Sequence, residues 1–420
     1  MKKIVGTIAA IALATSAVFA DVNVGMGFSR GIFTPFAYDG KDARMDISTS
    51  WGGQPRIGGS ISGASEDCGV VGDFKFDGGN LAVNDNAYIW VKPTSWLKLN
   101  IGQSFDDTLR GNACFGMWDW LRVGGFSITK VLVPGTPGSG NYSVDPATGL
   151  IVQATPAVPA VTVKLETTGI LTGEDFIFTR ICNNPLDGAW APLVGAILMA
   201  DPIDGLHIGV GLPIDGYNNQ KMEDVFAKMQ VQAGYTIDGV GTIKAQWIGG
   251  GKNYVKKVGD DPIVWGQIEA AFCLKAVEDM TLDIGAKFRT KEDSPVDVAA
   301  YWSMPFDALR VHASVGITYT PKAVGDDAVI GLVVGAAVDY DLGNGVGVTG
   351  DIRFGHSFCS ADGYDVDPAF AFGAWVNKGI ANGTIGIGVQ GALRQQIRDF
   401  TPSDIDDFTF AVPVRVQCFF

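Results

Sequence analysis

The sequence predicts an all-β fold: a closed, antiparallel, transmembrane β-barrel. Apolar residues recur at every second position over long stretches, which is the period of a strand whose successive side chains face opposite sides. Glycine accounts for 56 of 420 residues and charged residues for only 18%, against averages of ~7% and ~25%. The longest strongly apolar run, Val329 to Val338, is shorter than the ~18 residues that a membrane-spanning helix needs.

The composition also excludes several kinds of partner. Hydrophobic residues make up 47% of the chain and the mean hydropathy is +0.19, so the chain does not resemble charge-rich disordered proteins. A net charge of −14 repels phosphates, which excludes nucleic acid as a partner. We expect no metal site and no cofactor, since the three histidines, His207, His312 and His356, are too few and too scattered for a metal cluster.

Residues 1–20 have the pattern of a secretory signal peptide. Lys2 and Lys3 precede an apolar run from Ile4 to Leu13, and Val18 and Ala20 are small residues at the −3 and −1 positions of a cleavage site. We therefore expect cleavage after Ala20. The remaining residues, 21–420, are predicted to form a single barrel domain outside the bacterial cytoplasm.

The strands are read from the alternation itself, and the last one shows it most clearly. Phe408, Phe410, Val412, Val414 and Val416 form one face, and the residues between them are mostly polar or small. A tilted strand crosses a bilayer with ~9 to 11 residues, and many of the alternating runs reach that length. The predicted strands are 21–30, 43–51, 56–64, 69–77, 84–92, 95–104, 190–200, 204–213, 225–237, 240–249, 263–276, 279–290, 296–303, 308–320, 328–341, 345–357, 366–377, 380–394 and 407–420.

Short and long connections alternate along most of this trace. Asp238-Gly239 and Lys378-Gly379 are short, whereas Pro321 to Asp327 and Gln395 to Asp406 are longer and polar. In outer-membrane barrels the short turns face the periplasm. The alternation fails within residues 56–92, where we expect one wrong assignment or one misplaced turn. Because single-chain bacterial barrels have even strand numbers, we predict about 20 strands, within a range of about 18 to 22.

Residues 105–189 do not fit the strand pattern. The stretches Pro134 to Gly140 and Pro156 to Pro159 are rich in glycine and proline, as loops are. Short strands at 119–126 and 175–180 are alternatives. We expect a long loop here, or a segment that folds inward and constricts the barrel.

Charged residues on the face opposite the apolar one are candidates for lining a pore. A barrel of about 20 strands is too wide for its own side chains to fill, and rings of charge across such a pore set its ion preference. The candidates are Arg44, Asp46, Lys98, Lys228, Lys244, Asp283, Lys287, Arg289, Arg310, Asp351, Arg353, Arg394 and Arg415. For each one, a solvated wall residue without a filter role is the alternative.

The end of the chain resembles the carboxy-terminal insertion signal of outer-membrane barrel proteins. That signal consists of a terminal aromatic residue preceded by apolar residues at alternate positions, here Phe410, Val412, Val414, Val416 and Phe420. Pro413 departs from it and predicts a bulge. The whole chain is similar to general porins, and its leader, glycine content and scattered cysteines resemble barrels of spirochaetes such as treponemes. The resemblance implies insertion by the barrel-assembly machinery and a water-filled pore, often in a homotrimer.

The predicted function is therefore passive diffusion of small hydrophilic solutes and ions across the outer membrane. The alternative is an adhesin that displays its loops. A transporter of apolar solutes would need an amino-terminal plug, and the first predicted strand, which starts at Asp21, leaves no room for one. No enzymatic activity is expected, since His312 and Ser314 share one face but are not placed as hydrogen-bond partners. The six cysteines, Cys68, Cys114, Cys182, Cys273, Cys359 and Cys418, leave disulfides and free thiols equally open.

Overall fold

The computed structural model describes most of the chain between Asp21 and Phe419. The described residues are 21–38, 40–48, 56–77, 80–106, 108–109, 127–133, 139–144, 151–155, 161–166, 179–180, 194–214, 221–253, 263–291, 293–362, 364, 367–394 and 408–419. The predicted signal peptide with Ala20, the predicted strand at 119–126, and Phe420 lie outside them.

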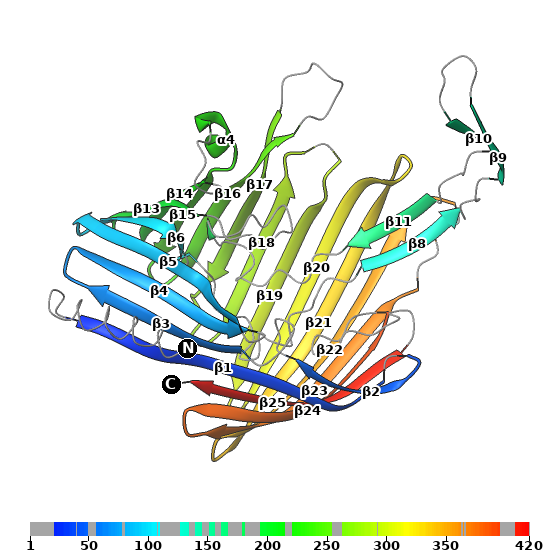
Figure 1. Cartoon of the computed structure of the whole chain (residues 1–420). Helices are drawn as coiled ribbons and strands as arrows, with labels where there is room; N and C mark the ends of the chain where they lie inside the picture. The colour runs from blue at the N-terminus through cyan, green and yellow to red at the C-terminus, as the bar shows by residue number, and fades with distance from the viewer. Residues whose placement is uncertain are drawn as a thin grey trace.

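Nineteen strands form one large sheet, in which every pair of neighbours is antiparallel (Figure 1). These strands are β1 (Asp21–Tyr38), β2 (Ala43–Ser48), β3 (Arg56–Ala64), β4 (Cys68–Asp77), β5 (Asn80–Thr94), β6 (Leu97–Gln103), β13 (Val194–Ile203), β14 (Leu206–Ile214), β15 (Gln230–Ile237), β16 (Gly241–Asn253), β17 (Ile263–Leu274), β18 (Thr281–Arg289), β19 (Val296–Phe306), β20 (Leu309–Val324), β21 (Asp327–Gly343), β22 (Val346–Cys359), β23 (Ala369–Ile380), β24 (Gly383–Leu393) and β25 (Phe408–Phe419).

Strand β1 closes this sheet into a barrel because both of its edges are paired. Residues 28–38 pair with β25 along one edge, and the other edge pairs with β3 and then with β2. Strands β2 and β3 thus lie end to end, and the nineteen strands occupy eighteen places around the ring. The predicted closed barrel is confirmed. Eighteen lies within the predicted range and below its central value of twenty.

The lower number arises because β6 pairs directly with β13. Six residue pairs, from Leu97 with Ala200 to Gly102 with Gly195, join the two strands. The strands described between β6 and β13 in the chain thus belong to an insertion between two neighbouring strands of the barrel. Within it, β7 (Phe105–Asp106) pairs with β12 (Thr179–Arg180), β8 (Ser127–Val133) with β11 (Val161–Glu166), and β9 (Ser139–Val144) with β10 (Ile151–Thr155).

Every run predicted as a strand corresponds to a strand of the main sheet, with one exception at its start. Residues 225–229, assigned to a strand, lie instead in helix α4 (Met222–Ala227) and just after it. The alternation of Val225, Ala227 and Met229 fits a strand. In the structure, however, the chain just after the helix is bound to β16, since the Met229 carbonyl oxygen accepts a hydrogen bond from Gly249 N at 3.0 Å. A Cβ atom on Gly249 would lie 2.4 Å from the Ala227 carbonyl oxygen, so the absence of a side chain there lets the helix end pack on β16.

Two predicted connections also differ from the structure. Pro321 to Asp327, predicted as a long loop, belongs mostly to the strands, because β20 and β21 continue to a two-residue turn at Gly325-Asp326. The difficulty within residues 56–92 came from the assumed alternation rather than from a wrong strand. Strand β3 is followed by a three-residue turn before β4, and β4 ends only three positions before β5 begins.

Four of the other short turns place an acidic or amide side chain in the left-handed backbone region. Asp279, Asp307, Asn344 and Asn382 have φ values between 54° and 58°, and each lies between two paired strands. Asp and Asn tolerate this region better than other side chains because they hydrogen-bond to nearby backbone. These residues therefore end one strand and start the next within two to six positions.

The predicted bulge near Pro413 lies in the facing strand. The register between β1 and β25 shifts between Phe33, which faces Val414, and Phe36, which faces Val412. Thr34 and Ala37 are both fully buried, whereas Phe33 and Phe36 are exposed, so the alternation slips by one residue at Pro35. Since neither Pro35 nor Pro413 has a backbone donor, the ladder is interrupted where these two residues approach.

The two faces of the barrel wall are chemically opposite. In β16, Ile243 is 54% exposed, whereas the adjacent Lys244 is 3% exposed. The same contrast recurs around the ring: the outward residues are large and apolar, and the inward ones include most of the buried polar side chains. An outward apolar surface with a polar interior is the pattern of a transmembrane barrel. Among the described residues, no helix is long and apolar enough to cross a membrane.

Candidate functional site: the inner wall and the segment bound to it

The structure places most of the predicted pore-lining residues on the inner wall. Lys98, Lys244, Asp283, Lys287, Arg289, Arg310, Asp351, Arg353 and Arg415 all alternate with outward neighbours and are buried or half-buried. Arg44 pairs with Ala37, which is fully buried. Asp46 lies in β2 opposite Thr34, and its side chain is outside the described part of the structure.

Two candidates lie elsewhere. Lys228 follows helix α4 and is not part of a strand. Arg394 lies one residue beyond β24, with a φ of 55°, and its guanidinium contacts the Asp367 carboxylate at 3.2 Å and the Pro368 carbonyl at 3.1 Å. The alternation of β24 predicted an inward side chain there, but the strand ends at Leu393 and Arg394 binds the facing loop.

One row of polar residues crosses the inner wall from β15 to β20. Its members are direct cross-strand partners: Gln232, Gln246, Glu269, Lys287, Asp297 and Thr318. The Gln246 amide donates to Glu269 at 2.5 Å, the Thr318 hydroxyl donates to Asp297 at 2.6 Å, and Lys287 Nζ lies 3.9 Å from Asp297. Alternate charges along a row satisfy one another, because opposite-charge pairs directly across strands attract.

The sequence reasoning missed several members of this row. Glu269 and Asp297 are 3% and 5% exposed, and both have the same parity as the inward residues Asp283 and Lys287 in the strands beside them. Glu269 also accepts a hydrogen bond from Gln267, which in turn accepts one from Arg289 Nε at 3.1 Å. A full count of charges and amides by parity would have found them.

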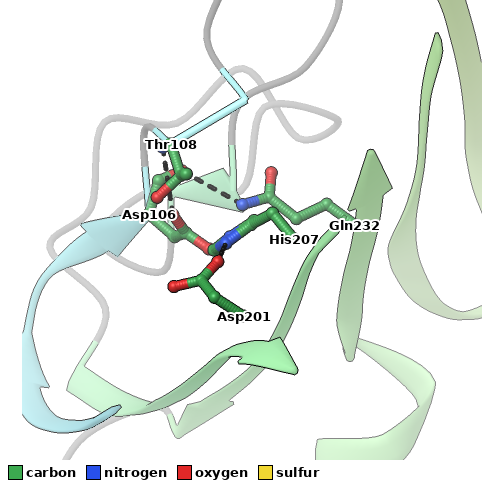
Figure 2. A network of polar contacts seen from close by, with 5 residues as sticks. All are labelled: Asp106, Thr108, Asp201, His207 and Gln232. Carbon is green, nitrogen blue, oxygen red and sulfur yellow. Dashed lines mark hydrogen bonds and ion pairs between the residues drawn. The ribbon is translucent and has the colours of Figure 1, made fainter. Parts of the chain in front are cut away.

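A chain segment after β6 lies against the same wall. Its described residues are Ser104, Phe105, Asp106, Thr108 and Leu109, and we call them the inward segment. Asp106 Oδ2 lies 2.8 Å from His207 Nε2, and the other ring nitrogen, Nδ1, lies 2.7 Å from Asp201 Oδ1 (Figure 2). His207 belongs to β14 and Asp201 to β13, so the segment is joined to two neighbouring strands of the barrel.

Further hydrogen bonds extend this attachment along the wall. The Asp106 carboxylate accepts a hydrogen bond from the backbone N–H of Thr108 at 3.1 Å. The backbone carbonyl oxygen of Asp106 accepts one from the Gln232 side-chain amide at 3.5 Å (Figure 2). Lys244 Nζ donates to the Leu109 carbonyl oxygen at 2.9 Å. Burial alone would raise the pKa of Asp106, but the hydrogen bond and the charge of His207 outweigh it, so this pKa lies below its ordinary value of 3.8.

Small residues in the wall make room for the segment. A Cβ atom on Gly209 would lie 2.5 Å from Asp106 Oδ2, and one on Gly234 would lie 2.4 Å from Leu109 Cδ2. The Leu109 side chain packs in one buried cluster with Ala271 of β17 and Ala299 of β19. Any larger residue at the two glycines would therefore occupy the space of the inward segment.

A second inward histidine, His312, contacts two residues of the barrel strands. His312 Nδ1 lies 2.8 Å from the Tyr301 hydroxyl, and Nε2 lies 3.0 Å from Asp339 Oδ2. The Ser314 hydroxyl donates to the Gly335 carbonyl oxygen at 3.5 Å. His312 and Ser314, the pair that we considered for hydrolysis, are thus each directed to other partners.

The inner wall changes character from β21 to β1. About half of its buried residues there are small or aliphatic, and the rest are mostly polar residues such as Thr349, Gln390 and Thr409. The small or aliphatic ones are Val329, Val333, Ala337, Ala369, Ala371, Ala392, Ala411 and Ala37. Tyr364, from the loop between β22 and β23, packs against Val329, Val333 and Ala369 and hydrogen-bonds through its hydroxyl to Ser357 at 2.7 Å. Burial raises the pKa of this tyrosine above 10.0.

Charged residues of this region occur in two groups. Arg353 Nε donates to Asp351 Oδ2 at 2.8 Å, and both side chains are nearly inaccessible. The guanidinium of Arg415 lies 4.7 Å from the ring centroid of Trp375, whose indole covers Gly388. Of the six cysteines, Cys68, Cys273, Cys359 and Cys418 are free, and Cys114 and Cys182 lie outside the described residues.

Comparison with known proteins finds likenesses in structure only. No protein-family model matches the chain, and no curated protein matches its sequence. A porin refined at 1.8 Å resolution is 13% identical, with 94% of this chain and 100% of that one aligned and a TM-score of 0.42. OccK1 (OpdK) of Pseudomonas aeruginosa is 10% identical, with 96% and 99% aligned and a TM-score of 0.49. OmpT of Vibrio cholerae is 10% identical, with 95% and 97% aligned and a TM-score of 0.44.

Proposed function

We propose that this chain is an outer-membrane channel of the porin type, through which small hydrophilic solutes and ions diffuse passively. The sidedness of the closed wall carries the proposal: exposed residues such as Ile243 and Ile284 face outward, and Lys244 and Asp283 alternate with them on the inside. Lipid offers no hydrogen bonds to a charged side chain, whereas water does. A wall with this polarity suits a lipid exterior and an aqueous interior.

The number of strands supports a channel. Barrels of 16 to 18 strands leave an aqueous passage, whereas about eight strands enclose only packed side chains. A ring with eighteen places is therefore wide enough for the aqueous passage that the proposal requires.

The test is single-channel recording with purified protein in planar bilayers. We expect discrete conductance steps, and ion-replacement reversal potentials would then measure the selectivity set by the inward charges. A folded, inserted barrel that stays electrically silent would contradict the proposal. No feature of the described residues favours the adhesin alternative.

We further propose that residues 105–189 contain a constriction, since the inward segment begins this insertion. Strands β6 and β13 are already neighbours, so a short glycine-rich turn can replace the insertion without changing the pairing of the barrel. The shortened protein is expected to conduct more than the full chain. An unchanged conductance would remove the constriction from the proposal.

Membrane insertion and assembly follow from the same proposal. Residues 1–20 would direct export of the chain and then be cleaved off, and the apolar face of Phe410, Val412, Val414, Val416 and Phe420 would present it to the insertion machinery. The first four of these residues lie in β25, which pairs with both β1 and β24 and therefore completes the ring. A homotrimer in the bilayer and a treponemal relationship belong to the proposal as well, and cross-linking in native membranes tests the former.

A further inference from the structure

We propose that His207 is a positioning residue that fixes the inward segment, with which the proposed constriction begins, by bridging two carboxylates as a doubly protonated imidazolium. The inference deepens the proposed function and rests on it where conductance is concerned. The attachment of the segment to the wall stands on geometry alone.

The two contacts of His207 determine its protonation state. Both ring nitrogens of His207 lie within 2.8 Å of a carboxylate oxygen, Nε2 of Asp106 and Nδ1 of Asp201. An ionised carboxylate only accepts hydrogen bonds, and a neutral imidazole donates from only one nitrogen. Both contacts are hydrogen bonds only if both nitrogens carry protons. The positive ring then lies between two negative groups, an arrangement in which charge-assisted bonds are strongest.

His207 connects the inward segment to the barrel wall. Asp201 is part of the barrel wall, whereas Asp106 belongs to the inward segment, 101 positions before His207 in the chain. The His207 and Asp106 side chains are 6% and 1% exposed. The bond between them is therefore shielded from competing water, while Asp201, with 63% of its side chain exposed, anchors the far side of the ring. The interaction joins a wall to a loop rather than two parts of the wall.

The groups around the His207 ring come from β7, β13, β15 and β16. The charged groups near it are Asp106 on β7, Asp201 on β13, and Lys244 on β16, which binds the Leu109 carbonyl. From β15, Gly234 is the direct cross-strand partner of His207 and Gln232 binds the Asp106 carbonyl. Among the described residues, the imidazolium is thus the cation that contacts the Asp106 carboxylate. When alkaline pH removes its second proton, one of the two bonds is lost.

His312 provides a matched control. It is also inward and also bridges two side chains, but Tyr301, Asp339 and His312 all belong to barrel strands. Replacing it perturbs these two wall contacts and leaves both partners of the His207–Asp106 contact in place. A general weakening of the barrel would affect both histidine variants, and a specific release of the segment would affect only one.

The experiment compares His207→Gln, Asp201→Asn and His312→Gln by hydrogen–deuterium exchange of the folded, reconstituted barrel. The Thr108 amide, which donates to Asp106, reports on the segment directly. We expect exchange there to rise about 10- to 100-fold in His207→Gln, less in Asp201→Asn, and not at all in His312→Gln. Heat-dependent electrophoretic mobility confirms that each barrel is folded.

Conductance and pH provide the second readout. Wild-type channels should reach at alkaline pH the larger conductance that His207→Gln shows at every pH. Unchanged exchange at Thr108 in His207→Gln, or an equal rise in His312→Gln, would overturn the positioning role. Silent channels whose Thr108 exchange responds as expected would overturn the channel function alone, so the two failures are distinguishable.

Discussion

The two halves of the inner wall are built on different principles. From β14 to β20, polar and charged side chains line the wall, and three contacts from them hold the inward segment. His207 contacts the Asp106 carboxylate, Gln232 donates to the Asp106 carbonyl oxygen, and Lys244 donates to the Leu109 carbonyl oxygen. From β21 to β1, about half of the buried wall residues are alanine or valine, and the buried charged residues are the Asp351–Arg353 pair and Arg415, which lies over the Trp375 ring. Both halves alternate in the same way and have an apolar outer face. The alternation does not fix the composition of the inner face, which therefore differs between the halves.

Redundancy is the physical consequence of this difference. In the polar half, the Asp297 carboxylate has Thr318 as a hydrogen-bond donor as well as Lys287 nearby. In the other half, the Asp351 carboxylate accepts a hydrogen bond from Arg353 through Oδ2, and Asp351 Oδ1 is buried without a hydrogen-bond partner among the described residues. The loss of one cation should therefore be tolerated in the first half and costly in the second.

The largest expected effect tests that contrast. Arg353→Leu leaves the buried Asp351 carboxylate without its cation and should destabilise the barrel by about 3 to 5 kcal/mol, the usual cost of breaking a buried pair. Lys287→Leu is the control and should cost less. Urea unfolding in lipid vesicles, followed by tryptophan fluorescence, measures both. Equal losses would show that the two halves do not differ in redundancy.

Asp106→Asn should have the next largest effect, and it should depend on pH. The pKa of Asp106 is lowered in the folded state, so the ionised carboxylate stabilises the protein above its ordinary pKa, and this stability is lost as pH falls through the lowered value. A hydrogen bond to a charged partner is worth about 1.5 to 3 kcal/mol.

Thermal unfolding midpoints at neutral pH and in strong acid check this expectation. The wild-type protein should be more stable than Asp106→Asn at neutral pH, and the two should converge in acid, well below 3.8. A difference that stays constant with pH would assign the effect of the substitution to shape rather than charge.

Gly234→Val sharpens the comparison through packing instead of charge. The added side chain would occupy the position of the Leu109 methyl groups, and overpacking of this kind costs about 1 to 3 kcal/mol. Released from the wall, the segment should also leave a larger conductance.

Gly347→Ala, in β22, is the matched control for that substitution. A Cβ atom there meets its nearest neighbour, the Tyr340 carbonyl oxygen, at an ordinary 3.7 Å. The expected loss of stability is much smaller, and conductance should not change. Equal effects of the two variants would mean that Gly234 does not shape a seat for Leu109.

The smallest effect is expected outside the wall. Lys322 and Asp293 form an ion pair at 3.0 Å between exposed side chains, in the segments that follow β18 and end β20. Exposed pairs contribute about 0 to 1 kcal/mol, so Lys322→Ala should fall within that range in the same unfolding assay. A loss as large as that of Arg353→Leu would show that burial does not govern the strength of these pairs.

The sequence by itself determined the fold class, the position of almost every strand and the inward parity of nine of the charged candidates, from Lys98 to Arg415. The side that a residue faces depends only on its position along the strand, because successive side chains face opposite sides. Lipid requires apolar residues on the outer side, so the sequence shows which side is which. Reasoning on strand periodicity alone placed Lys228 and Arg394 wrongly, because α4 and the end of β24 depend on contacts with Gly249 and Asp367.

Only the tertiary structure decided which inward residues meet. His207 and Asp106 are 101 positions apart, and nothing in either local pattern joins them, since the contact depends on the direction in which the chain turns after β6. The closing of β1 on both β25 and β3, which fixed the ring at eighteen places, is likewise a long-range pairing. Alternation dictates the side that a residue faces, and the register between distant strands dictates its neighbours.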